Sequence, residues 1–261
     1  MKRILHSIQT LGLLLIRAYQ REGPWYAIRK GCAYVAMWPI DVLVPLFNKY
    51  FNKNISTFTF RGQPYNYYFH SYNATRKNER SVEIPIIWQI VQENSDKRIL
   101  EIGNVLRHYF PCSHDTVDLT ERYPGVIIRD ITDFRPGNKY ELIVSISTFE
   151  HIGCWEKGHR QPEKLLQAIE NVMENVLTAG GEFILTVPFG YNPDMDSYLA
   201  DGTIKFNSSY CMKQTDAKMN SWQESPWSEI REHEFNTQGE WCGKHKTLLI
   251  GIMKSAKDEM T

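Results

Sequence analysis

The residues best placed to do chemistry follow apolar runs in the middle of the chain. Glu101 and Gly103 close the run that begins at Ile99, and Asn104 comes next. An apolar run with an acid inside it and a glycine at its end is typical of a buried parallel strand that stops at a ligand crevice. A side chain is costly where backbone must approach a ligand, so Gly103 suits that position. Glu101 could accept from a cationic amino group, directly or through water.

Two further acids stand at the predicted ends of the following strands. Asp118 ends the run Thr116-Val-Asp118, at a spacing from Gly103 that suits two adjacent ribose hydroxyls. Asp130 could accept from the exocyclic amine of an adenine ring that Ile131 covers. The alternative for Asp118 is an ordinary surface acid in a turn, and Asp133 competes with Asp130 for its role.

A second buried run, from Tyr140 onward, opens into small polar residues, an acid and a histidine. Ser147 would line the same crevice. His151 would stand at the mouth, where a histidine is a suitable general base near neutral pH. The alternative is that His151 caps and shapes the loop.

The bulk composition describes a globular protein without a strong charge bias. The 261 residues carry no net charge, with 42% hydrophobic residues. This length and composition suit one α/β domain plus an appendage, and the strongly basic patch of a nucleic-acid binder is missing. Five scattered cysteines with no C-x-x-C pattern indicate a reducing compartment, so a cytoplasmic location is expected.

The first 56 residues differ from the rest. Residues 1–60 carry eight lysines and arginines against two acids, among many apolar and aromatic side chains. The pattern predicts a helical extension over residues 1–56, ahead of a main domain over residues 57–255. Residues 1–51 either form a cap on the catalytic domain or make a peripheral contact with the inner face of a membrane. The apolar stretch at residues 31–47 is too short and too interrupted by Pro39, Asp41 and Pro45 to span a bilayer.

The chain predicts a hairpin over residues 57–70, a polar segment to residue 84 and a helix starting at Pro85. Strands are expected at 98–102, 115–119, 125–129, 140–147, 182–187, 203–212 and 247–253. A helix begins at Pro162 and ends at Ala179-Gly180-Gly181. This order predicts a Rossmann-like α/β fold with a mostly parallel seven-stranded sheet and helices on both faces.

These motifs resemble class I S-adenosylmethionine-dependent methyltransferases. The similarity is carried by Ile99-Leu-Glu-Ile-Gly103, Val117-Asp-Leu119, Asp130-Ile131, Leu142-Ile-Val-Ser-Ile-Ser-Thr-Phe-Glu-His151 and Leu177-Thr-Ala-Gly-Gly-Glu-Phe-Ile-Leu185. It implies S-adenosylmethionine as cofactor, bound by Glu101, Gly103, Asn104, Asp118, Asp130, Ile131 and Ser147. The family usually has more glycines after the first strand, and a proline where this chain has Ala179.

A narrower resemblance concerns bacterial methyltransferases that accompany surface-polysaccharide synthesis. It implies that Tyr72, Asn73, Arg80 and Glu83 contact a small or glycan-like acceptor. The expected reaction is methyl transfer to an oxygen, with a nitrogen as the less favoured target.

Other functions compete with methyl transfer. The alternatives are a non-catalytic Rossmann-like scaffold at a membrane surface and a dehydrogenase, which the missing Gly-x-Gly-x-x-Gly disfavours. No metal is expected, because Cys112, His114, His151 and Cys154 match no strong zinc pattern.

Overall fold

The computed structural model describes residues 57–70, 72–154, 160–216, 220–231 and 247–256, with isolated positions between 15 and 32. The predicted helical extension over residues 1–56 lies almost entirely outside these residues. Within the described part of the chain, no helix combines the length and apolar character needed to cross a bilayer.

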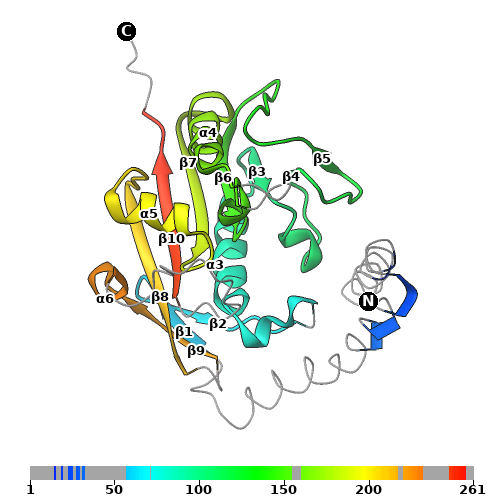
Figure 1. Ribbon diagram of the computed structural model, residues 1–261, viewed down its shortest axis with the longest axis vertical. Coiled ribbons are helices and arrows are strands. Elements are labelled where there is room, and N and C mark those ends of the chain that lie inside the picture. Colours follow the sequence, from blue (N-terminus) through cyan, green and yellow to red (C-terminus); the bar gives the residue numbers. More distant parts are fainter. Residues whose placement is uncertain are drawn as a thin grey trace.

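The centre of the molecule is a mixed sheet of eight strands (Figure 1). In chain order these are β3 (Ile99–Ile102), β4 (Asp115–Asp118), β5 (Val126–Ile128), β6 (Tyr140–Ile146), β7 (Leu177–Pro188), β8 (Ser208–Asp216), β9 (Ser221–Ser225) and β10 (Thr247–Lys254). Their spatial order is β5-β4-β3-β6-β7-β10-β8-β9. The first five pair in parallel, whereas β10 is antiparallel to β7 and β8, and β9 to β8.

This order makes the fold Rossmann-like. The chain builds outward from β3 to β4 and β5, then returns to the other side of β3 for β6 and β7. A crevice forms beyond the carboxyl ends of β3 and β6, where the direction of winding reverses. The five predicted parallel strands are confirmed to within a few residues, apart from an earlier start of β7.

The predicted count of seven strands is wrong. The additional strand, β9, lies at the edge of the sheet and alternates little between apolar and polar residues. Its hydrogen bonds to β8 decide its conformation, and a sequence pattern does not show them. Since β9 adds an antiparallel pair with β8 that was not predicted, the sheet is also more mixed than predicted.

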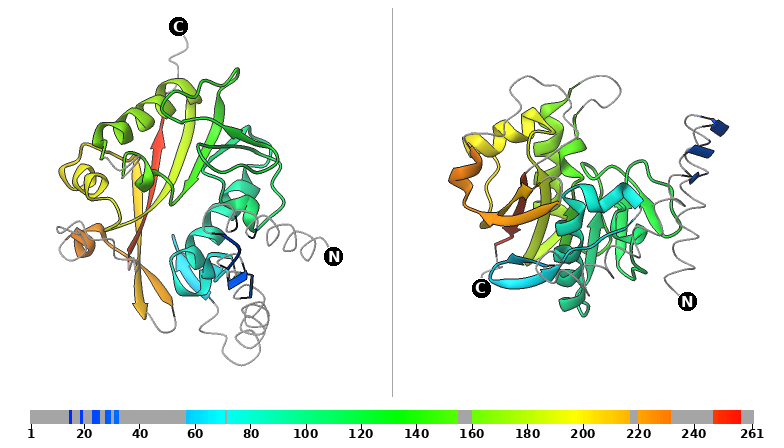
Figure 2. Two further views of the ribbon diagram at one scale, coloured as in Figure 1. Left: turned by 45° about the vertical axis from the view of Figure 1, so that its right-hand side comes forward. Right: turned by 90° about the horizontal axis from the view of Figure 1, so that it is seen from below.

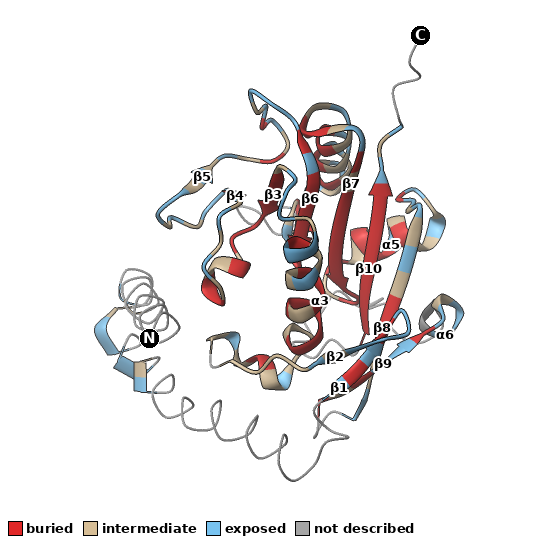
Figure 3. Ribbon diagram, turned by 180° about the vertical axis from the view of Figure 1, so that it is seen from behind, coloured by how far each residue is buried: buried red, intermediate tan, exposed pale blue. Residues whose placement is uncertain are grey.

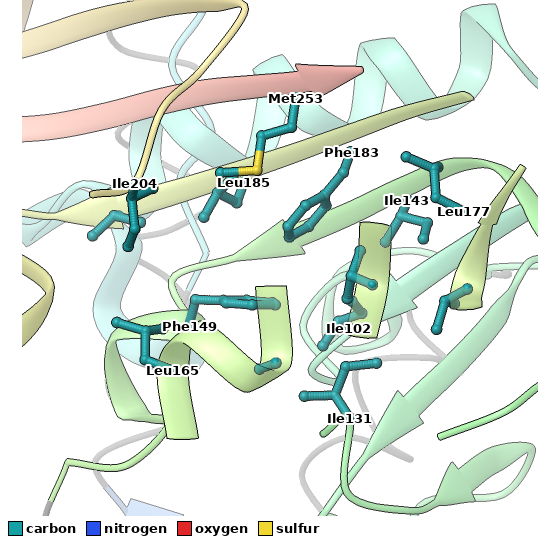
Figure 4. Close-up of a cluster of buried hydrophobic side chains, with 14 of the residues drawn as sticks. Ile102, Ile131, Ile143, Phe149, Leu165, Leu177, Phe183, Leu185, Ile204 and Met253 are labelled. Atoms are coloured by element: carbon teal, nitrogen blue, oxygen red, sulfur yellow. The ribbon is translucent and has the colours of Figure 1, made fainter. Parts of the chain in front are cut away.

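Helices cover both faces of the sheet, as predicted. On one face α3 (Arg80–Glu93) packs in an apolar layer with β6, β10 and the hairpin of β1 (Thr57–Phe60) and β2 (Gln63–Asn66). On the other lie α4 (Pro162–Asn171) and α5 (Pro193–Asp201). Figure 2 shows α3 and α4 on opposite sides of the sheet, and Figure 3 shows the central strands buried. Figure 4 shows Phe149, Leu165 and Phe183 gathered in the layer under α4.

The predicted start of α3 at Pro85 is wrong, because the helix begins at Arg80 and contains the proline. A proline inside a helix has no N–H for the carbonyl four residues earlier, which here belongs to Ser81. The backbone N–H of Tyr68 donates to this Ser81 carbonyl instead, at 2.9 Å. A partner from outside the helix therefore satisfies the carbonyl that the proline leaves without a donor inside the helix.

The predicted end of the next helix is also wrong. α4 ends at Asn171, a π-helical turn η5 (Val172–Val176) follows, and β7 already begins at Leu177. Gly180 and Gly181 therefore lie inside a strand. Their backbones pair with the chain after β10, through Gly180 N–H to Ala256 and Ser255 N–H to Gly181.

Candidate cofactor and active site

A cavity of about 800 Å³ lies at the carboxyl ends of β3, β4, β5 and β6. The loops after these strands line it, together with the segment before α3 and Lys164 of α4. Of the predicted ligand contacts, those lining the cavity are Gly103, Asn104, Asp118, Asp130, Ile131, His151, Tyr72, Asn73 and Arg80. Glu101, Ser147 and Glu83 do not line it.

Gly103 is required by the packing of the protein itself. Its φ of +85° favours glycine, and a Cβ there would lie 2.2 Å from Thr148 Oγ1. Its N–H donates to the Val117 carbonyl at 2.8 Å. The loop after β3 therefore lies directly against the loop after β6, which explains the glycine without any ligand.

Glu101 supports this loop from behind. Its side chain is fully buried, and Oε1 accepts from the backbone N–H groups of Val105 and Leu106 at 3.0 and 2.7 Å. Oε2 lies 3.0 Å from His114 Nε2. Both oxygens are thus bound within the protein, and this arrangement does not favour direct contact between Glu101 and a ligand.

Asp118 lies at the cavity wall and orders the turn around it. Oδ1 accepts from the N–H groups of Thr120 and Glu121 at 2.8 and 2.6 Å. Oδ2 accepts from the Asn104 N–H at 3.0 Å. A carboxylate oxygen has two lone pairs, so Oδ2 retains capacity for a ligand donor.

Glu121 and His108 also line the cavity, and the sequence did not single them out. Glu121 Oε1 lies 2.6 Å from His108 Nε2 and accepts from Asn104 Nδ2 at 2.7 Å. The ring of Tyr72 stacks on His108 at 4.2 Å between centroids. The only sequence signal was their position, within a few residues of Asp118 and Asn104.

Asp130 is held by a lysine from α4. Lys164 Nζ lies 2.8 Å from Oδ2, and the N–H and hydroxyl of Thr132 donate to Oδ1. Burial by itself would raise the pKa of Asp130, but the hydrogen bonds from Lys164 and Thr132 outweigh it and lower the pKa. The carboxylate therefore stays ionised, next to Ile131 in the cavity wall. Asp133 does not line this cavity.

Glu83 and Ser147 lie behind the cavity wall and position Arg80. Glu83 Oε2 accepts from the hydroxyls of Ser147 and Thr186, both at 2.7 Å. Its Oε1 forms an ion pair with Arg80 Nε at 3.1 Å, while Arg80 Nη1 donates to the Ile146 carbonyl at 3.4 Å. The guanidinium is therefore oriented from behind and lines the cavity.

His151 ends a 3-10 turn, η4 (Phe149–His151), at the rim of the cavity. Its side chain is 54% exposed, and Nε2 lies 3.9 Å from Glu150 Oε1. The ring of Tyr191 packs edge-on at 4.6 Å. Glu150 itself is buried, and burial raises the pKa of its carboxyl well above the usual range.

Tyr72 and Asn73 lie at the rim in a short turn, η2 (Tyr72–Lys77). Asn73 and Ala74 both have positive φ, 55° and 46°, which is strained for residues with side chains. The following residues are held by the residue that precedes β9, because Asn220 Nδ2 donates to the Asn78 carbonyl at 3.0 Å.

Within the described residues, no group of three or more His, Cys, Asp or Glu could hold a metal ion. The thiol of Cys112, which was considered above as a zinc ligand, donates to the Phe110 carbonyl. The carboxylate of Asp194 pairs with Arg160.

No protein-family model and no curated protein matches the chain. Among solved structures, it is similar to the N-methyltransferase NodS from Bradyrhizobium japonicum WM9 in complex with S-adenosylhomocysteine. The identity is 12% over 68% of this chain and 88% of that one, with a TM-score of 0.42. A methyltransferase from Clostridium acetobutylicum matches at 12% identity, covering 83% and 99%, with a TM-score of 0.35. CalS10, an amino pentose methyltransferase from Micromonospora echinaspora, matches at 19%, covering 46% and 57%, with a TM-score of 0.32. Similarity at this level lends no support to a particular activity.

Proposed function

We propose that this chain is an S-adenosylmethionine-dependent methyltransferase that acts on an oxygen of a small or glycan-like acceptor. One observation carries the proposal. A single cavity at the switch point of the sheet brings together a loop without a side chain at Gly103, carboxylates at the ends of successive strands, and His151 at the rim. The sequence motifs alone would allow these groups to lie apart.

The residues of the cavity suit the cofactor. Its volume of about 800 Å³ lies within the usual range for small-molecule sites, roughly 300–1,000 Å³. Asp118 Oδ2 can accept from a ribose hydroxyl. Leu119, 48% exposed, and Ile131 offer apolar surface for a flat ring beside the ionised Asp130. The buried Oδ1 of Asn104 has no hydrogen-bond partner among the described residues, and a bound donor would satisfy it.

Arg80, Tyr72 and Asn73 would contact the acceptor. They come from the segment before α3 and from the first residue of that helix, separate from the loops that carry the proposed cofactor contacts. Because Glu83 orients the guanidinium of Arg80, this cation is already ordered before an acceptor binds. Pre-ordering reduces the entropy that binding must overcome.

Bound S-adenosylmethionine would supply a methyl group already activated by the positive sulfonium. The chain then has to align the acceptor and remove a proton from it. Of the two histidines that line the cavity, His108 is buried and pairs with Glu121, whereas the half-exposed ring of His151 stands where an acceptor hydroxyl could reach it. We therefore assign it the role of general base.

The test is calorimetric titration of the full chain with S-adenosylmethionine and S-adenosylhomocysteine. Asp118→Asn should weaken binding about tenfold, since a charged acceptor is lost. Asp96→Asn, an exposed acid remote from the cavity, is the matched control and should not change binding. No binding by the folded wild type would refute the proposed function.

The acceptor atom is then decided by product analysis. Sugars that offer hydroxyl or amino groups are incubated with cofactor and enzyme, and the methylated product is located by NMR. An N-methylated product would overturn the preference for oxygen.

We also propose a cytoplasmic protein that touches the membrane face through residues 1–51. The excess of lysine and arginine among apolar residues there supports this. Equal partition of the full chain and a chain lacking residues 1–51 between cytosol and membranes would refute the contact.

A further inference from the structure

Glu101 occupies an unusual position for an acid, in the middle of the sheet. Its side chain has no exposure to solvent, yet it reaches the underside of the loop that lines the cavity. One oxygen accepts from two consecutive backbone N–H groups, those of Val105 and Leu106. The orientation of this carboxylate therefore determines the path of the chain directly after Gly103.

His114 is the partner that orients the carboxylate. Its Nε2 lies 3.0 Å from Glu101 Oε2, and its side chain is only 5% exposed. A carboxylate can only accept, so Nε2 carries the hydrogen. If residue 114 were apolar, Oε2 would be buried without a partner, which is costly for a charged oxygen.

Further hydrogen bonds join other residues of the connection between β3 and β4 to the region around His114. Arg107 donates to the His114 carbonyl at 2.6 Å and to Thr116 Oγ1 at 2.9 Å. On the cavity side, Asp118 binds the Asn104 N–H. The loop after β3 is thus fixed by hydrogen bonds on two sides. Asp118 binds it at the cavity wall, and Glu101, oriented by His114, binds it on the side away from the cavity.

We propose that His114 is a positioning residue for the cofactor: by donating to Glu101 it holds residues 103–106 in the shape to which the cofactor binds. The inference rests on the proposed function, because it takes S-adenosylmethionine and its product as the ligands. His114 does not line the cavity, so its side chain acts through Glu101.

Three variants test this role by calorimetric titration with S-adenosylhomocysteine, which needs no acceptor. His114→Phe keeps the bulk of the ring but removes the donor. His114→Gln retains an amide donor at the position of Nε2. Tyr140→Phe is the matched control, because it removes the partly buried hydrogen bond that the Tyr140 hydroxyl donates to Asp115, the residue next to His114, away from the cavity.

His114→Phe should weaken binding about tenfold, while His114→Gln and Tyr140→Phe should stay within about threefold of the wild type. Melting temperatures are measured in parallel, and His114→Phe and Tyr140→Phe should both fall. If His114→Phe does not fold, His114→Asn replaces it, since its shorter amide does not reach Glu101.

The outcomes separate this inference from the proposed function. A wild type that does not bind would overturn both. If the wild type binds and His114→Phe binds as tightly, the positioning role alone would be overturned. Equal weakening by His114→Phe, His114→Gln and Tyr140→Phe would reduce His114 to a general contribution to stability, and would also overturn it.

Discussion

Replacement of Gly103 by alanine tests the close contact between the loops after β3 and β6. The substitution adds a single methyl group at a residue with φ of +85°. That methyl would meet Thr148 Oγ1 at 2.2 Å, Cγ2 at 2.8 Å and Cβ at 3.0 Å. Thr148 has little freedom to move away, because its hydroxyl donates to the Ile146 carbonyl at 3.0 Å.

Two costs contribute to the expected loss. The left-handed backbone costs a residue with a Cβ about 1–2 kcal/mol. Overpacking against Thr148 adds about 1–3 kcal/mol. The free energy of unfolding should therefore fall by about 2–5 kcal/mol, a large part of the roughly 5–15 kcal/mol that stabilises a typical domain.

Urea unfolding followed by circular dichroism measures this loss of stability. A matched glycine separates the backbone cost from the cost of overpacking against Thr148. Gly62, in the β1–β2 turn, has φ of +73° and nothing within 4 Å of an added Cβ. Gly62→Ala should therefore show the backbone cost alone. Thr148→Ala removes the two closest atoms, so Gly103→Ala combined with Thr148→Ala should cost about 1–3 kcal/mol less than the sum of the single substitutions.

The reasoning fails if Gly103→Ala costs no more than Gly62→Ala and shows no coupling with Thr148→Ala. Gly103 would then serve the approach of a ligand, and the substitution would show its effect in cofactor titration.

Three further substitutions test buried polar groups. Burial raises the pKa of Asp196 to about 7. Between about pH 4 and pH 7 the folded chain therefore keeps a proton that the unfolded chain has already released. The free energy of unfolding falls as pH rises through that window, and Asp196→Asn should flatten the fall in urea titrations at a series of pH values. Asn220→Ala should cost about 2–4 kcal/mol, because several buried groups lose their partner; a melting temperature close to that of the wild type would contradict this. Glu83→Ala should cost about 3–5 kcal/mol by leaving Arg80 unpaired, with partial recovery on adding Arg80→Met.

The predicted strands were mostly right because the signal for a buried parallel strand is local. β3 and β6 are nearly continuous apolar runs that contact helices on both faces, and their neighbours in sequence are sufficient to identify them. The errors lie where a distant partner decides the conformation. Ser81 at the start of α3 depends on Tyr68, and β9 depends on its hydrogen bonds to β8.

The candidate site shows the same division. The sequence places Asp118 at the end of one strand and Asp130 after the next, and in the structure both line one cavity. It could not distinguish them from Glu101, which has the same chemistry but lies inside the strand and points to the underside of a loop. Glu121 and His108 can be recognised as part of the site only in the structure, because they meet where the connections after β3 and β4 pack together.

The sequence by itself determined the Rossmann-like order of elements and the residue types that stand at the strand ends, because apolar runs and glycines act on their immediate neighbours. The tertiary structure decided which carboxylates face the cavity and which are used to build it. A buried polar group must find a hydrogen-bond partner, and that partner is often remote, as with Asn220 and Asn78, 142 residues apart. Which segments meet is a property of the packed sheet, so the roles of Glu101, His114 and Glu83 follow from the fold and not from their spacing in the chain.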